Sequence, residues 1–192
     1  MTTTIYIVRH GQTDGNKLRV FQGRIDTPLN DTGREQILET CKKLAKMEVT
    51  FDILISSPLS RALESAQIIR SFYPSRKPII IDDNVIERSF GMAEGIPLTD
   101  ENYKKIMNNE FIDQESEFEI LKRAKHFIYN LLEKYPGKTI MVVTHSHFLK
   151  ACMKPYIKSL QFNTKTLNAG VSILKFNDFK RCLHAAIDIN KE

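Results

Sequence analysis

The 192-residue sequence contains no tryptophan, only three cysteines and no long hydrophobic run. Cys41, Cys152 and Cys182 lie far apart and are odd in number, which fits free thiols in a reducing compartment better than a metal site or a disulfide framework. The apolar run near the N-terminus is too short for a signal peptide, and no run approaches the ~20 residues that span a membrane. We therefore expect a cytoplasmic protein without a membrane partner.

The sequence also lacks a charged tail and a basic stripe. Lys and Arg number 28 against 23 Asp and Glu, and the excess is spread along the chain. This balance favours small anionic ligands and does not indicate nucleic-acid binding. With 42% hydrophobic and 27% charged residues, residues 1–192 are expected to form a single compact domain. The pattern does not define an oligomeric state.

Several short apolar runs have the composition of buried β-strands. They begin at Ile5, Phe51, Pro78 and Lys138, and they are rich in β-branched residues without strict alternation, as expected for a parallel sheet covered on both faces. Helical patterns separate these runs, and "GVSILKF" and "CLHAAIDI" resemble two antiparallel strands at one edge. The order predicts an α/β three-layer sandwich, with a mostly parallel central sheet, helices on both faces and an antiparallel edge strand.

Two helix starts and one irregular segment bear on function. "TGRE" predicts a capping box from Thr32 to Glu35. "SSPLSRALESAQ" predicts a helix with Ser57 as its N-cap and Pro58 at its first position, so that free amides near Ser57 would be available to an anion. Residues 91–114 show neither the helical nor the strand pattern of apolar residues. This predicts a small lid-like excursion over the sheet rather than a core element.

Reactive side chains follow each of the predicted parallel strands. In chain order they are Arg9-His10-Gly11, Ser56-Ser57 with Arg61, Glu87-Arg88 and Thr144-His145. Because ligands bind at the carboxyl ends of parallel strands, we expect these groups to share one crevice. Guanidinium groups and amides match phosphate, while a histidine that attacks and a carboxyl that protonates a leaving oxygen make a transfer site.

The motifs around these residues resemble those of the histidine phosphatase superfamily, also called the phosphoglycerate mutase-like family. They are "VRHGQTDGN", "FQGRIDTPLNDTGREQ", "SSPLSRALESAQ", "ERSFGMAEG" and "VVTHSHF", and they occur in the family's order over nearly the whole chain. The resemblance implies a phosphatase-type member that forms a phosphohistidine on a small phosphorylated metabolite. It implies no cofactor and no metal, because cationic side chains replace one.

The resemblance also implies roles for individual residues. His10 would be the nucleophile and Glu87 the proton donor, and Glu87 must then hold a proton at the working pH, which predicts an acidic to neutral optimum. The phosphoryl oxygens would be bound by Arg9, Asn16, Arg61, His145 and Ser146. The leaving group would be approached by Phe21, Gln22 and Gly23.

Charge and hydrogen bonding predict the states of the two histidines. Arg9 and Arg61 should lower the pKa of His10, whose second nitrogen should donate to a backbone carbonyl in the Gly11 turn. His145 should be protonated against phosphate in the complex. Ser146 stands where many relatives have glycine, so its amide can still face phosphate while its side chain narrows the approach.

Three alternatives stay open at this point. His145 and His147 have the spacing of metal ligands, although no acidic cluster accompanies them. Mutase activity is the second alternative, but the lid lacks the family's additional basic residues and is net acidic, which favours a singly phosphorylated or partly apolar ester. Its charged residues are Asp100, Glu101, Glu110, Asp113 and Glu115 against Lys104 and Lys105. The third is a non-catalytic phosphate-binding module. Such a module should have lost at least one of five central residues, which are Arg9, His10, Arg61, Glu87 and His145, and all five are present.

Overall fold

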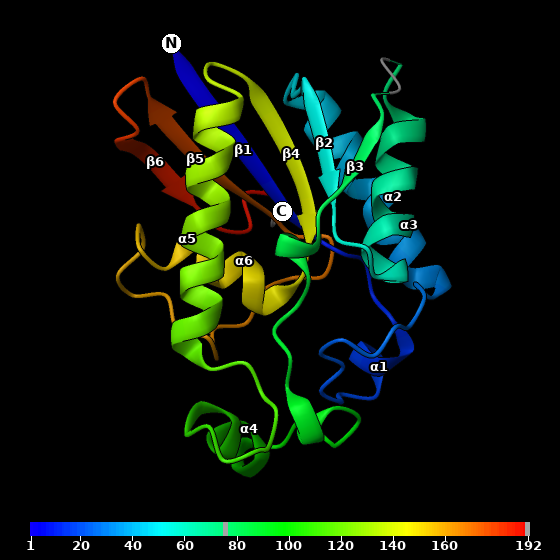
Figure 1. The fold of residues 1–192 in the computed structure, drawn as a ribbon. Helices are drawn as coiled ribbons and strands as arrows, with labels where there is room; N and C mark the ends of the chain where they lie inside the picture. Colours follow the sequence, from blue (N-terminus) through cyan, green and yellow to red (C-terminus); the bar gives the residue numbers. More distant parts are fainter. Residues whose placement is uncertain (75–76, 191–192) are drawn as a thin grey trace.

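The computed structural model describes residues 1–74 and 77–190, and within them six strands form one sheet in the order β3-β2-β4-β1-β5-β6 (Figure 1). The strands are β1 (Thr2–Arg9), β2 (Ile53–Ser56), β3 (Ile79–Ile81), β4 (Thr139–Thr144), β5 (Val171–Asn177) and β6 (Cys182–Ala186). The four strands β1, β2, β3 and β4 run parallel to one another, while β5 is antiparallel to both of its neighbours, β1 and β6. The predicted α/β fold and its antiparallel edge are confirmed.

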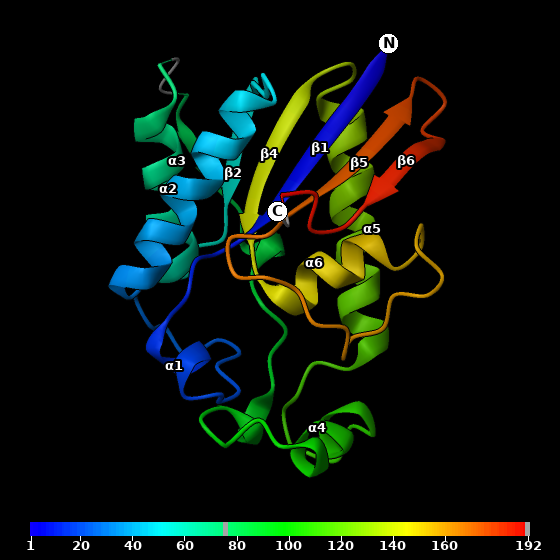
Figure 2. The same cartoon turned by 180° about the vertical axis from the view of Figure 1, so that it is seen from behind.

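Helices cover both faces of the sheet (Figures 1 and 2). α2 (Asp31–Lys46) and α3 (Ser60–Phe72) cover one face, and α5 (Glu117–Lys134) and α6 (Ser146–Met153) cover the other. α1 (Asp14–Lys17), α4 (Asp100–Met107) and the 3-10 turns η1 (Asp83–Val85) and η2 (Gly91–Ala93) complete the helical elements. Along β4, Ile140 and Val142 pack in the core under α5 and α6, whereas Met141 and Val143 pack in the core under α2 and α3. Burial on both faces explains why this strand lacks polar alternation.

The predicted start of α2 is wrong in its capping residue. The helix begins at Asp31, and the N-cap is Asn30, whose side chain accepts a hydrogen bond from the Gly33 amide at 2.9 Å. Thr32 therefore lies inside the first turn and does not form the predicted capping box with Glu35. Asparagine and threonine are both good N-caps, and the local sequence offered both.

The predicted start of α3 is also wrong, and the reason is a tertiary contact. The helix begins at Ser60, and its N-cap position is Leu59, which has no capping side chain. Asp26, from a different loop, accepts hydrogen bonds from the Ser60 amide at 2.7 Å and the Ser60 hydroxyl at 2.6 Å. Ser57 and Pro58 precede the helix. The first amide of α3 is thus bonded to a carboxylate and is not free for an anion, contrary to expectation.

The lid segment has more structure than its sequence predicted. Thr99 caps α4 by accepting from the Asn102 amide at 3.1 Å. Ile106 of α4 is fully buried in a small separate cluster with Phe21, Phe90 and Ala93. The segment lies beyond the carboxyl ends of the parallel strands, where Figures 1 and 2 both show α4. It is therefore packed onto the loop that carries Phe21 and closes one end of the sheet.

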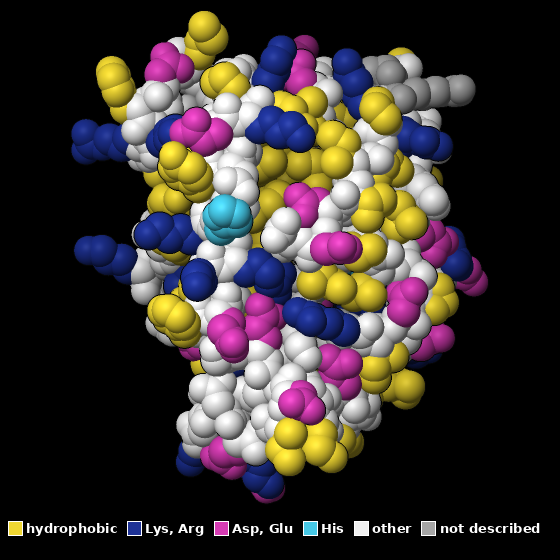
Figure 3. All heavy atoms as spheres, viewed as in Figure 1, with side chains coloured by type: hydrophobic (Ala, Val, Ile, Leu, Met, Phe, Trp, Pro, Cys, Tyr) yellow, Lys and Arg dark blue, Asp and Glu magenta, His cyan; other side chains and the backbone are white. Residues whose placement is uncertain are grey.

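The outer surface around α5 mixes both signs of charge, as Figure 3 shows. Beyond α5, hydrophobic side chains are visible toward the β3 edge, where Ile80 and Ile81 are 37% and 47% exposed. In residues 1–74 and 77–190, no helix is long and apolar enough to cross a membrane.

Candidate active site

His10 is the first residue after β1, and its ring is held in one orientation. Its amide donates to the Thr144 carbonyl at 2.9 Å, which anchors it beside the end of β4. The ring Nδ1 lies 2.6 Å from the Gly11 carbonyl, and because a carbonyl only accepts, Nδ1 carries the proton. Burial, followed by the charges of Arg61 and Arg9, lowers the pKa of His10 well below its ordinary value. His10 therefore presents a neutral ring with a free Nε2, as the sequence predicted.

Two arginines surround this histidine, Arg61 fully buried and Arg9 half-buried. Arg61 is 1% exposed, and its Nη2 and Nη1 donate to the carbonyls of Gly23 at 2.7 Å and Ile25 at 2.8 Å. Arg9 donates from Nη1 to the Thr166 carbonyl at 2.7 Å. The Nε atoms of both arginines are buried without a hydrogen-bond partner among the described residues. Burial lowers the pKa of both, that of Arg61 to about 10, so the pocket contains desolvated cations with unused donors.

His145 completes the cationic side of the pocket. Its ring centroid is 5.1 Å from that of His10, and its Nε2 is 2.8 Å from the Ser57 hydroxyl. Its Nδ1 is buried without a partner in the described chain. Burial, then Arg61 and His10, lowers the pKa of His145 well below its ordinary value. The ring is thus neutral without ligand, and its protonated form in the phosphate complex stays a prediction.

Glu87 brings a buried carboxylate to the same pocket. Its Oε1 accepts hydrogen bonds from the amides of Arg88 at 2.9 Å, His147 at 3.1 Å and Phe148 at 3.2 Å. Burial lowers the pKa of Arg9 and Arg61, and the charge of Glu87 is the leading effect that opposes this. The carboxylate therefore lies close enough to act on both guanidinium groups, at the start of the helix that follows His145.

Two histidines, two arginines and one carboxylate thus meet at the strand ends. A sequence profile described as the histidine phosphatase superfamily (branch 1) matches residues 5–188. The chain belongs to the histidine phosphatase superfamily. The fold, the order of the motifs and the arrangement of the pocket agree with this assignment.

Individual relatives are phosphatases. PhoE of Bacillus subtilis (strain 168), named as an uncharacterized phosphatase, is 33% identical over 184 residues, which cover 93% of this chain and 91% of PhoE. A metal-independent phosphoserine phosphatase of Arabidopsis thaliana is 27% identical over 98% of this chain and 82% of its own. A solved phosphoserine phosphatase variant of Entamoeba histolytica, in complex with phosphoserine, superposes with a TM-score of 0.81 at 25% identity over 98% of both chains. This histidine phosphatase is a phosphoric monoester hydrolase.

Two more predicted phosphate ligands lie at the rim of the pocket. The Oδ1 of Asn16 accepts from the Thr13 amide at 3.2 Å and from Asn168 Nδ2 at 3.0 Å, which leaves the Asn16 NH2 group as a donor. The hydroxyl of Ser146 is 3.0 Å from that of Thr166. The side chain that replaces the family's glycine is therefore tied to a neighbouring loop. The phosphate-binding roles of Asn16 and Ser146 stay predictions.

The three predicted leaving-group residues differ in their surroundings. Phe21 is 2% exposed, and its ring meets that of Phe90 edge-on at 5.2 Å in the lid cluster. Gln22 accepts two threonine hydroxyls at its Oε1, at 2.8 and 2.6 Å, so that its amide NH2 is the group left over. Gly23 has a φ of +51°, and its carbonyl is the one held by Arg61. Gln22 is thus the one of the three with an unused polar group.

His147 does not share a ligand position with His145. Its ring stacks on Phe162 at 5.1 Å between centroids, and its Nε2 is 3.4 Å from the Tyr103 hydroxyl of the lid. Burial, then Lys150, lowers its pKa well below the ordinary value. Across the described parts of the chain, no three His, Cys, Asp or Glu side chains are grouped as a metal site requires.

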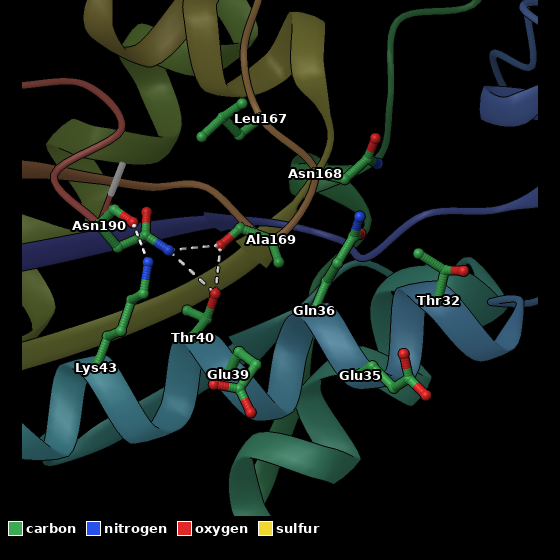
Figure 4. A pocket seen from close by; sticks show the side chains of 10 residues that line it. All are labelled: Thr32, Glu35, Gln36, Glu39, Thr40, Lys43, Leu167, Asn168, Ala169 and Asn190. Carbon is green, nitrogen blue, oxygen red and sulfur yellow. Dashed lines mark hydrogen bonds between the residues drawn. The ribbon is translucent and has the colours of Figure 1, made fainter. Parts of the chain in front are cut away.

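The loop at residues 166–169 supports the pocket and was missed at the sequence level. Asn168 donates to the His10 carbonyl at 3.3 Å across 158 positions of sequence. The neighbouring Ala169 carbonyl accepts from Thr40 of α2 at 2.9 Å and from Asn190 at 3.1 Å. Figure 4 shows the two bonds to the Ala169 carbonyl beside an open groove of about 340 Å³ between α2 and this loop. None of the five central residues lines this groove. The bonds from Thr40 and Asn190 to Ala169 fix the loop, and Asn168 of the same loop donates to the His10 carbonyl.

Proposed function

We propose that this histidine phosphatase is a metal-independent phosphomonoesterase that forms a phosphohistidine at His10 and acts on a small phosphorylated metabolite. The observation that carries the proposal is the His10 ring, buried among Arg9, Arg61 and His145 with its Nδ1 proton bonded to a carbonyl and its Nε2 free. Two relatives support the proposal: one is named as a metal-independent phosphoserine phosphatase, and the other was solved in complex with phosphoserine.

The first step transfers the phosphoryl group to the protein. The His10 Nε2 lone pair forms the bond to phosphorus as the bond from phosphorus to the leaving oxygen breaks. Glu87 in its acid form gives its proton to that oxygen, and the leaving group departs as an alcohol. Arg9, Arg61 and a protonated His145 stabilise the charge on the phosphoryl oxygens, as preorganised cations do in a water-poor pocket.

The second step restores the enzyme. Water attacks the phosphorus of the phosphohistidine, the bond from Nε2 to phosphorus breaks, and the Glu87 carboxylate takes the proton from water. Inorganic phosphate leaves, and both His10 and Glu87 return to their starting states. The three cationic groups supply the charge that a metal would otherwise contribute.

Phosphate release from p-nitrophenyl phosphate and a panel of natural monoesters, between about pH 5 and 8 with excess chelator, tests the proposal. We expect chelator-resistant turnover in the parent and in His126→Ala, a matched control on the exposed face of α5, and a loss of at least about 10³-fold in His10→Ala. Rapid-quench mass spectrometry should find the phosphoryl adduct on the His10 peptide. Turnover abolished by chelator, or retained in His10→Ala, would refute the mechanism.

A further inference from the structure

The backbone around Arg24 is fixed by the phosphate-binding machinery. The carbonyls on its two sides, those of Gly23 and Ile25, both accept from the Arg61 guanidinium, at 2.7 and 2.8 Å. The Arg24 amide itself donates to the Glu94 carboxylate at 3.0 Å. These three bonds hold Arg24 next to the site where the phosphoryl group would bind, although neither the motif pattern nor the proposed mechanism uses this residue.

The side chain of Arg24 lies beside the backbone of Glu87. Its Nε is 3.5 Å from the backbone carbonyl oxygen of Glu87, and the side chain is 45% exposed. The Glu87 carboxyl group gives its proton to the leaving oxygen in the proposed mechanism, so the leaving group must lie beside Glu87. Arg24 is therefore an exposed cation next to the residue that the leaving group must approach.

The charge of Arg24 is not balanced by its carboxylate neighbour. Glu115 is 3.6 Å from Arg24, but it accepts shorter bonds from Arg123 at both oxygens, 2.9 and 2.7 Å. One carboxylate carries a single negative charge, so it cannot balance both the Arg123 and the Arg24 guanidinium groups. Glu101 is likewise paired with Lys105 at 2.7 Å. Two of the five acidic residues counted for the lid are thus paired with basic side chains.

Gln22 adds a second donor in the same loop. Its Oε1 accepts the hydroxyls of Thr13 at 2.8 Å and Thr27 at 2.6 Å, and its NH2 group forms no hydrogen bond within the described residues. An amide NH2 and a guanidinium can only donate. A leaving group recognised by such groups must supply acceptors. One unbalanced cation with a planar fork matches the single charge of a carboxylate better than the double charge of a second phosphate.

We propose that Arg24 binds a carboxylate on the leaving group, so that esters of hydroxy acids are preferred over esters of neutral alcohols. This inference rests on the proposed function, since it assigns a substrate class to the same pocket. Arg24 acts in substrate selection, and its contribution belongs to KM and to kcat/KM rather than to the chemistry on phosphorus.

Two pairs of esters that differ in the carboxylate test the proposal. The first pair is 3-phosphoglycerate and glycerol 3-phosphate, and the second is O-phosphoserine and O-phosphoethanolamine. For each pair we expect the parent to show the higher kcat/KM on the carboxylate ester. In Arg24→Ala this preference should fall by about tenfold or more, mainly through KM, as loss of a charge-assisted hydrogen bond predicts. Arg24→Lys should retain part of it.

Arg181→Ala is the control, because it removes the same charge from an exposed position in the turn between β5 and β6. It should keep the parent's preference. A parent that hydrolyses all four esters equally well, or an Arg24→Ala variant in which both members of a pair fall together, would overturn the carboxylate assignment and leave the phosphatase intact. A parent that hydrolyses no ester would overturn the proposed function and this inference with it.

Discussion

Replacing Arg61 by methionine should nearly abolish turnover while changing stability only slightly. Burial lowers the pKa of Arg61 to about 10, and this difference from an ordinary guanidinium corresponds to a penalty of about 3 kcal/mol for the charged side chain in the folded protein. Methionine carries no such penalty. The opposing loss is that of two hydrogen bonds. The buried Gly23 carbonyl costs about 1–3 kcal/mol if it stays unsatisfied. The bond to the Ile25 carbonyl is only partly buried, so its loss costs less.

These opposing effects nearly cancel, so the free energy of unfolding should change by no more than about 2 kcal/mol in urea titrations at pH 7. kcat/KM should fall by at least about 10³-fold, because the transferring phosphoryl group loses charged donors. Arg70→Met, an exposed position on the same helix, is the control. A drop in unfolding free energy above about 4 kcal/mol would make Arg61 a structural residue. Turnover within tenfold of the parent would remove it from the phosphate site.

Two further predictions concern α6. Phe148 is fully buried, and its ring lies 5.7 Å from the Phe127 ring and 4.8 Å from the Arg123 guanidinium. Phe148→Ala should therefore lower the free energy of unfolding by about 3–5 kcal/mol. A loss below about 1 kcal/mol in urea titration would contradict this packing. Lys150 donates to the Phe162 carbonyl at 2.7 Å, and burial lowers its pKa to about 8. Between pH 8 and about 10 the unfolded chain then binds a proton that the folded protein does not, so stability rises with pH by up to about 3 kcal/mol through this group. Lys150→Met should lack that rise, and equal slopes in parent and variant would refute the assignment.

The strand ends were the part of the site that the sequence predicted best. Arg9, His10 and His145 directly follow apolar runs that could only be strands buried on both faces, and parallel strands bring their carboxyl ends together whatever the details of packing. Glu87 was different. It follows β3 only after the turn η1, and no local pattern marks it, so it was assigned through the family resemblance alone. Its buried carboxylate beside α6 is a finding of the structure.

Apart from the α2 cap, where two neighbouring residues were both good candidates, the errors at the sequence level come from contact between distant segments. The Ser60 amide at the start of α3 is bonded to Asp26 from another loop, while the Ser57 hydroxyl accepts from the Leu59 amide at 3.3 Å and lies 2.8 Å from His145 Nε2. Thr166 and Asn168 support Arg9 and His10 from an irregular loop more than 150 positions away. Capping preferences and periodicity describe neighbours in sequence, and they contain no information about such partners.

The pocket keeps its charges available by pairing them with neutral backbone groups. Arg9 and Arg61 donate to the carbonyls of Thr166, Gly23 and Ile25. The carboxylate of Glu87 accepts from backbone amides at the start of α6. Within the described residues, none of these three side chains forms an ion pair. Each of these groups is therefore held in place by neutral backbone groups rather than by a salt bridge. A phosphate dianion would meet oriented cations without first breaking a salt bridge, and this is the condition under which preorganised charge stabilises a transition state most effectively.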